Sequence, residues 1–260
     1  MRLKALILDV DGTMADTEEA HRCAFNDAFQ EHGLDWNWSK PRYAHLLSTT
    51  GGKERLAAYI DSLPAAPEER RALRGRIADI HRTKTALYTR MVNAGMVPLR
   101  EGVARLMHEA TMAGVQLGIA STTTFANIEA LLRTNLGPRA LELFAVIGTG
   151  DQVPHKKPAV DIYEWVLRRL TRSAGDCAAI EDSANGLTAA KSAGLYTVVT
   201  PSYWTRGEDF AAADLVLPSL GSPEKPLTQR AAVLVGGTLL GLRELNRRLD
   251  NVRELGRAMS

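Results

Sequence analysis

Acidic, hydroxyl and lysine side chains occur in this sequence at the predicted ends of strands. The residues concerned are Asp9, Asp11, Ser121, Lys157, Glu181 and Asp182. Because parallel strands bring their carboxyl ends to one edge of a sheet, we expect these groups to converge there. Oxygen ligands from one or two carboxylates, completed by water and phosphate, are what Mg²⁺ prefers. The set therefore predicts a site for a divalent cation and a phosphoryl group.

Each of these motifs is weak by itself. An Asp-x-Asp pair is more often a plain turn at the end of a strand, and Glu181–Asp182 could simply cap the helix that follows. Four motifs in order, each on a predicted strand end, favour a functional site over that interpretation.

Alternating strands and helices position these residues. Strands are predicted at 5–8, 115–120, 144–149, 177–182, 196–200 and 214–217, and helices at 103–113, 125–134, 159–171 and 185–193. This alternation predicts right-handed βαβ units and hence an α/β fold, a doubly wound, Rossmann-like parallel sheet.

Only helical patterns follow the first strand as far as residue 92. We therefore expect an inserted α-helical cap domain at 16–93 and a core domain made of 1–15 and 94–260. Residues 68–92 are predicted to form the longest helix of the insert, with Pro67 in the loop before it. An insert at this place would close over the site and exclude water.

The C-terminal segment 228–260 has no assigned role. Leu242, Leu245, Leu249 and Val252 have helical spacing, which predicts an amphipathic helix that packs on its own core or on a partner.

Composition excludes several classes of protein. The net charge of +2, from 32 basic and 30 acidic residues, argues against nucleic acid as a partner. The longest apolar stretch, 231–242, is shorter than the roughly 20 residues of a membrane span. Cys23 and Cys177 are far apart in the sequence, which favours free thiols in a reducing cytoplasm. We expect a cytoplasmic monomer with no membrane association.

The motifs resemble those of haloacid dehalogenase superfamily phosphotransferases with a helical cap. They are DVDGT at 9–13, Ser121 in IAST, Lys157 in KKPAVDIY, and Glu181–Asp182 in IEDSANG. Three segments of the insert are similar to the CbbY group of sugar bisphosphate phosphatases, relatives of β-phosphoglucomutase: DTEEAHRCAF at 16–25, LLSTTGGKERL at 46–56 and HRTKT at 81–85. The resemblance extends to about residue 220; Met14 and Val160 depart from it without removing a functional atom.

The resemblance implies a role for each acidic residue. Asp9 would attack phosphorus and become an aspartyl phosphate. Asp11 would protonate the leaving oxygen, take a proton from water, and bind the metal through its backbone carbonyl. Asp182 would complete the Mg²⁺ ligands, and Glu181 would hold a metal-bound water or orient the other ligands.

Phosphoryl oxygens would be bound at the neighbouring strand ends. Ser121 and Lys157 would hold the non-reacting oxygens, and Thr122 would contact substrate beside them. Lys157 is preferred over the adjacent Lys156 because it directly precedes Pro158, as in the family pattern.

On the insert, the resemblance implies further substrate contacts. Glu18, Glu19 and His21 would face the sugar hydroxyls, and Tyr43 and Lys53 a distal phosphate. The alternatives are a buried core histidine for His21 and a solvated helix start for Lys53, as also for Arg55.

The resulting hypothesis is an Mg²⁺-dependent phosphatase of a small sugar bisphosphate. The resemblance implies hydrolysis of xylulose 1,5-bisphosphate, an inhibitor of the carbon-fixing enzyme rubisco, to xylulose 5-phosphate. A mutase of the β-phosphoglucomutase type and a phosphoglycolate phosphatase are the alternatives, with Thr13 slightly favouring a phosphatase. A non-catalytic sugar phosphate binding protein and a metal-independent dehalogenase are less consistent with this set of groups.

Overall fold

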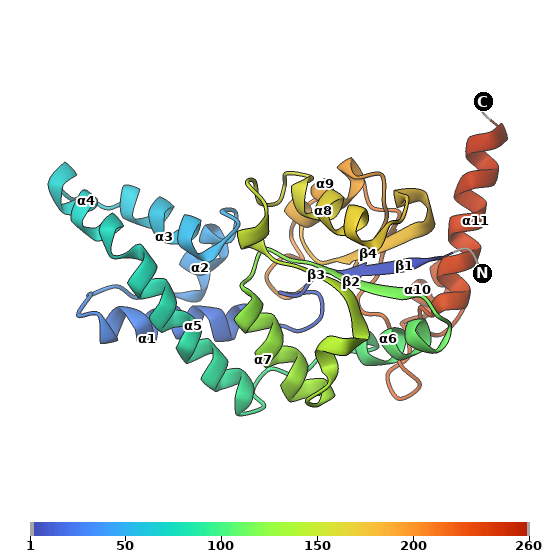
Figure 1. Cartoon of the computed structure of the whole chain (residues 1–260), viewed down its shortest axis with the longest axis horizontal. Helices are drawn as coiled ribbons and strands as arrows, with labels where there is room; N and C mark the ends of the chain where they lie inside the picture. Colours follow the sequence, from blue (N-terminus) through green and yellow to red (C-terminus); the bar gives the residue numbers. More distant parts are fainter. Residues whose placement is uncertain (1–2, 259–260) are drawn as a thin grey trace.

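A computed structural model describes residues 3–258 of the chain, with side chains as far as residue 251. Within this range six parallel strands form one sheet in the order β3-β2-β1-β4-β5-β6 (Figure 1). The strands are β1 (Ala5–Leu8), β2 (Gln116–Ala120), β3 (Phe144–Gly148), β4 (Cys177–Glu181), β5 (Tyr196–Val199) and β6 (Leu215–Val216). The predicted doubly wound α/β core is confirmed.

The first strand lies in the middle of the sheet, and its register fixes the site. Leu8 pairs with Ile119 of β2 and with Ile180 of β4, so the three strands end side by side. Every residue of β1 is buried. Leu6 and Leu8 pack into the core on one face, whereas Ala5 and Ile7 pack on the other, which explains the uninterrupted apolar run.

Helices cover both faces of the sheet (Figure 1). Those on one face are α6 (Val103–Met112), α7 (Phe125–Leu136), α10 (Gln229–Val235) and α11 (Leu242–Ala258). Those on the other face are α8 (Asp161–Leu170) and α9 (Ala184–Ser192). Three short 3₁₀ helices are described in the connections: η1 (Ala140–Leu143), η2 (Gly150–Gln152) and η3 (Ala174–Asp176). Among the described residues, no helix combines the length and apolar character that crossing a membrane requires.

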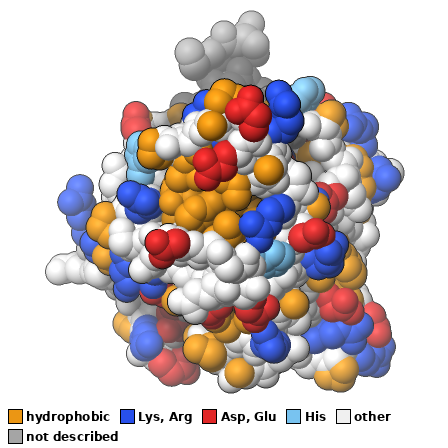
Figure 2. Space-filling model, turned by 90° about the vertical axis from the view of Figure 1, so that its left-hand side faces the viewer, with side chains coloured by type: hydrophobic (Ala, Val, Ile, Leu, Met, Phe, Trp, Pro, Cys, Tyr) orange, Lys and Arg blue, Asp and Glu red, His pale blue; other side chains and the backbone are white. Residues whose placement is uncertain are grey.

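Five helices follow β1 and form a lobe beyond its carboxyl end (Figure 1). They are α1 (Glu18–Glu31), α2 (Lys40–Leu46), α3 (Gly52–Asp61), α4 (Pro67–Gly75) and α5 (Ile77–Asn93), here called the insert. The insert has its own aromatic core around Phe25, Phe29 and Trp38. Its outer end carries an apolar area among charged side chains (Figure 2). We propose that the insert is the cap domain expected at 16–93.

The single long helix expected at 68–92 was wrong. The structure has two helices there, with Arg76 between α4 and α5. Gly75 is a poor helix former, and the Arg76 side chain donates to the carbonyl of His32 at 2.6 Å, which holds the break against the end of α1. Pro67 is the first residue of α4 instead of part of the preceding loop, a position that proline favours.

The C-terminal helix packs on its own core. Leu242, Leu245 and Leu249 of α11 are buried in the cluster that lies against the sheet. The side chain of Val252 lies outside the described residues. The thiols of Cys23 and Cys177 are free, as expected.

Candidate active site

Lys157 joins two carboxylates at the centre of the sheet edge. Its Nζ lies 2.7 Å from Asp9 Oδ1 and 2.6 Å from Glu181 Oε1, and all three side chains are buried. Burial alone would lower the pKa of Lys157, but the two carboxylates raise it, so the ammonium is retained. The hydroxyl of Tyr163, on α8, donates to the same oxygen of Glu181. The lysine is therefore fixed beside the predicted nucleophile.

Three buried carboxylates gather at this edge. Asp9, Glu181 and Asp182 each offer an oxygen, and these oxygens lie within 4.8 Å of one another. Burial raises the pKa of Asp9 to about 7, although Lys157 pulls in the opposite direction. Burial and the neighbouring carboxylates also raise the pKa of Asp182. Against a single ammonium, this excess of negative charge fits a hard divalent cation such as Mg²⁺.

The surroundings of these carboxylates separate their roles. Oε1 of Glu181 accepts from Lys157 and Tyr163, and Oε2 accepts the backbone N–H of Asp182 at 3.3 Å. Asp182 Oδ2 accepts from the neutral hydroxyl of Thr205 at 3.1 Å and has no ammonium partner among the described ion pairs. This arrangement favours Asp9 and Asp182 as direct metal ligands, with Glu181 orienting the groups around them.

The carboxylate of Asp11 points to the insert instead of joining this cluster. Its Oδ1 accepts from the Thr17 hydroxyl at 2.7 Å and lies 3.0 Å from His21 Nε2. His21 Nδ1 in turn lies 2.7 Å from Lys84 Nζ. Since the lysine donates to Nδ1, the ring proton resides on Nε2 and is donated to Asp11.

The contacts among Asp11, His21 and Lys84 also determine the charge of each side chain. Burial and Lys84 lower the pKa of His21, which keeps the imidazole neutral. Burial alone would raise the pKa of Asp11, but His21 and Thr17 lower it, so Asp11 is held as the carboxylate. Burial lowers the pKa of Lys84 to about 8. Asp11 is therefore held in a form that can accept a proton, and it lines the same cavity as Asp9.

A cavity separates the sheet edge from the insert. The core contributes groups that include Asp9, Thr122, Lys157 and Asp182, and the insert contributes groups that include Glu18, Lys53, Arg55, His81 and Lys84.

The core and the insert also contact each other directly. Lys156 Nζ lies 2.7 Å from Glu54, Lys53 Nζ lies 3.7 Å from Asp151, and the Asn185 amide donates to Thr50 at 2.9 Å.

Comparison with known proteins decides the family. A sequence profile of the haloacid dehalogenase-like hydrolases matches residues 3–194. The chain belongs to this family. Protein CbbY of Rhodobacter capsulatus is 48% identical to this chain over 222 residues, which cover 85% of this chain and 96% of the CbbY protein. The plasmid-encoded CbbY of Cupriavidus necator is 51% identical over 229 residues, with 87% and 89% covered.

A solved structure agrees with this assignment. A mutant CbbY from Rhodobacter sphaeroides, crystallised with xylulose-(1,5)bisphosphate, is 45% identical to the hydrolase. It superposes with a TM-score of 0.79 and covers 85% of the hydrolase and 98% of that chain. With relatives this similar, the hydrolase is an enzyme of the phosphatase class.

The hydrolase places the predicted residues of the core around one point. Lys157, and not Lys156, contacts Asp9. Ser121 is buried beside the cavity, where its Oγ accepts the N–H of Thr123 at 3.2 Å, and Thr122 lines the cavity.

The insert residues predicted to bind substrate divide into two groups. Glu18, His21 and Lys53 line the cavity of the hydrolase. Glu19 does not, because it pairs with Arg22 at 2.7 Å on another side of α1. Consecutive residues of a helix point about 100° apart, so only one of the two glutamates can face the substrate.

Tyr43 also lies behind the cavity wall. It is fully buried, and its hydroxyl donates to Glu18 at 2.5 Å and accepts from Arg55 at 2.9 Å. The hydroxyl thus holds two residues that line the cavity, and the structure does not place it against a distal phosphate.

Several residues of the site had no predicted role. Tyr163 lies in the KKPAVDIY segment, and His81 and Lys84 lie in HRTKT, so family resemblance contained a signal for them. Thr205 lies in a loop without a recognisable pattern. Only the structure reveals that this hydroxyl reaches Asp182.

Proposed function

We propose that this enzyme is an Mg²⁺-dependent phosphatase that hydrolyses xylulose 1,5-bisphosphate to xylulose 5-phosphate and phosphate. The observation that carries the proposal is the Lys157 ammonium held between Asp9 and Glu181, with the ionised Asp11 lining the same cavity as Asp9 and Lys157. Such an arrangement suits a carboxylate nucleophile with a separate proton acceptor. The CbbY relative crystallised with the same bisphosphate supports the choice of substrate.

The reaction would proceed through the two aspartates of the first loop. Asp9 would attack the C1 phosphorus in line. Asp11, which the substrate-free structure holds as a carboxylate, would have to take up a proton before it donates one to the departing sugar oxygen. Asp11 then accepts a proton from the water that hydrolyses the aspartyl phosphate. Its ionised state in the structure is the one required for this second step. Lys157 offsets the charge on the transferring phosphoryl group.

A bound Mg²⁺ would neutralise the phosphoryl oxygens during transfer. Asp9, Asp182 and the backbone carbonyl of Asp11 would hold it. Gly12 supports this assignment, because a Cβ at this position would meet Asp182 Oδ2 at 2.1 Å. The backbone there is close to Asp182 only because the residue is glycine.

The distal phosphate would bind at the insert side of the cavity. Lys53, Arg55 and Lys84 on that side, together with Lys156 of the core, supply positive charge opposite the acidic edge. A bisphosphate suits this distribution better than a monophosphate, because its second phosphate lies among cations.

A substrate panel tests the proposal. Phosphate release should give a higher kcat/KM for xylulose 1,5-bisphosphate than for phosphoglycolate or hexose phosphates, and EDTA should abolish it. Asp9→Asn should remove activity, whereas Asp79→Asn, on an exposed position of α5, serves as the matched control. Rapid conversion of β-glucose 1-phosphate to glucose 6-phosphate without free phosphate, given a trace of the 1,6-bisphosphate, would instead identify a mutase.

We further propose that the enzyme works as a cytoplasmic monomer that removes a rubisco inhibitor. Light scattering coupled to size-exclusion chromatography tests the oligomeric state. Recovery of rubisco activity after inhibition by xylulose 1,5-bisphosphate tests the role.

A further inference from the structure

The two connections between the core and the insert lie side by side. The first leaves the loop that carries Asp11, and the second returns the chain to α6. Ala15 of the first forms an antiparallel bridge with Leu99 of the second. The N–H of Arg100 also donates to the carbonyl of Met14 at 2.8 Å. The returning connection therefore lies directly against the catalytic loop.

Arg100 gathers three separate segments at this place. Its Nη1 donates to the carbonyls of Gly12 and Thr200, the second at 2.7 Å, and its Nη2 donates to the carbonyl of Pro201 at 2.9 Å. Nε lies 3.5 Å from Asp16, where the insert begins. Only 12% of the side chain is exposed. The planar guanidinium can serve all these acceptors at once, which an ammonium cannot.

Two of the segments held by Arg100, at Gly12 and at residues 200–201, carry or position groups of the active site. Gly12 directly follows Asp11, whose carbonyl is the proposed metal ligand. The N–H of Thr200 donates to the carbonyl of Glu181 at 2.8 Å. The loop after Pro201 brings Thr205 to Asp182. The two sides of the proposed cation site are thus connected through one side chain.

We propose that Arg100 is a positioning residue that fixes the distance between the Asp11 loop and Asp182. This inference rests on the proposed Mg²⁺ site. Arg100 does not line the cavity, so it acts through the backbone groups that it holds and not by contact with the substrate.

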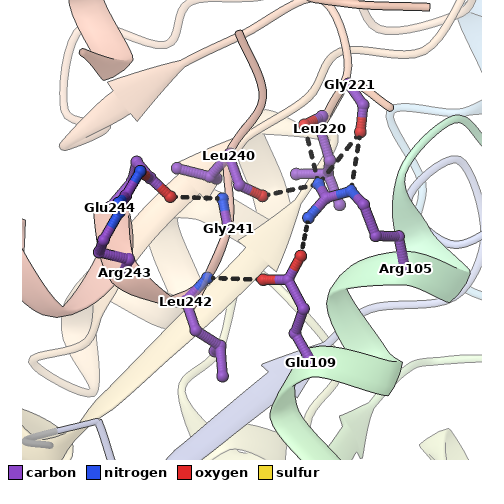
Figure 3. Close-up of polar contacts among 9 residues, drawn as sticks. All are labelled: Arg105, Glu109, Leu220, Gly221, Leu240, Gly241, Leu242, Arg243 and Glu244. Carbon is purple, nitrogen blue, oxygen red and sulfur yellow. Dashed lines mark hydrogen bonds and ion pairs between the residues drawn. The ribbon is translucent and has the colours of Figure 1, made fainter. Parts of the chain in front are cut away.

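Arg105 provides a matched control (Figure 3). It is also a largely buried arginine, with 18% of its side chain exposed. Its guanidinium donates to the carbonyls of Leu220, Gly221 and Leu240 and pairs with Glu109. None of these partners lines the cavity. Arg105 therefore also binds backbone carbonyls of separate segments, but it connects α6 to residues 220–240 and lies away from the active site.

The test compares Arg100→Lys with Arg105→Lys in the full-length enzyme. Calorimetric titration with Mg²⁺ alone should show an affinity at least about tenfold lower for Arg100→Lys and unchanged for Arg105→Lys, as expected for residues behind a metal site. The kcat of Arg100→Lys should fall by about tenfold or more with little change in KM. Thermal unfolding should show similar losses of stability in both variants.

The proposal is overturned if Arg100→Lys binds Mg²⁺ with wild-type affinity, or if both variants lose Mg²⁺ affinity equally. Arg100→Gln, measured in the same way, keeps the test decisive if the lysine variant does not fold, since its amide keeps N–H donors and adds no charge to the buried position. Absence of phosphatase activity in the wild type would contradict the proposed function instead. Mg²⁺ affinity measured without substrate keeps the two failures distinct.

Discussion

Gly12→Ala tests whether the catalytic loop and Asp182 are as closely packed as the structure shows. Gly12 has φ +81°, and an added Cβ would lie 2.1 Å from Asp182 Oδ2. Ordinary contact begins at 3.4 Å. The carboxylate oxygen must therefore retreat by about 1.3 Å, the difference between these two distances, or the loop must move by as much.

Two separate costs follow from this change. The left-handed backbone conformation disfavours alanine by about 1–2 kcal/mol, which lowers Tm by roughly 2–8 °C in a chain of this size. Displacement of a proposed metal ligand by about 1 Å should also reduce kcat by about 100-fold, or about 2.7 kcal/mol of transition-state stabilisation.

Gly33→Ala separates the two effects. Gly33 has φ +65°, but nothing lies within 4 Å of a Cβ built there. This variant should lose similar stability in thermal unfolding and keep wild-type phosphate release. The reasoning would be refuted if Gly12→Ala retained full kcat, or if Gly33→Ala lost activity to the same degree.

Three further predictions concern charge. Lys157→Met leaves the buried Asp9 and Glu181 carboxylates without their cation, so the free energy of unfolding of the metal-free enzyme at pH 8 should fall by about 3–5 kcal/mol, measured with urea. Burial, with Lys84 nearby, lowers the pKa of His81 to about 3. Because the unfolded chain binds this proton near pH 6.5 and the folded chain does not, the contribution of His81 to the free energy of unfolding should fall by about 1 kcal/mol between pH 7 and 5.5. The difference in stability between the wild type and His81→Gln, measured by urea unfolding at the two pH values, should change by that amount. Saturating Mg²⁺ should raise Tm in a thermal shift assay above that of the metal-free enzyme, and excess EDTA should return Tm to the metal-free value. An unchanged Tm at saturating Mg²⁺ would contradict the proposed metal site.

The core of the site could be predicted because each of its motifs is local. An apolar run predicts where a buried strand ends, and Asp9, Ser121 and Asp182 occur within two residues of such ends. The parallel sheet then determines that these ends meet. Lys157 lies in a loop, and it was distinguished from Lys156 only through the family resemblance, in which the lysine directly precedes the proline.

The insert could not be predicted in this way, because helix spacing does not say which side faces the cavity. Glu18 and Glu19 are equivalent in sequence, and packing of α1 against α5 decides between them. Tyr43 was predicted as a substrate contact, but it is buried in the aromatic core of the insert and its hydroxyl donates to Glu18. The carbonyl contacts of Arg100 join segments about a hundred residues apart, as the separation from Thr200 shows, and no local pattern marks them.

The central place of β1 has a consequence for synthesis of the chain. β1 is made first, but its neighbours β2 and β4 begin only at residues 116 and 177. At typical rates of translation this leaves the apolar strand without partners for on the order of ten seconds or more, an interval in which such segments aggregate. The insert, whose helices contact one another locally, can fold meanwhile. Asp9 and Asp11 place charge directly beside the apolar strand, and we expect this charge to oppose aggregation of the nascent chain before the active site has formed.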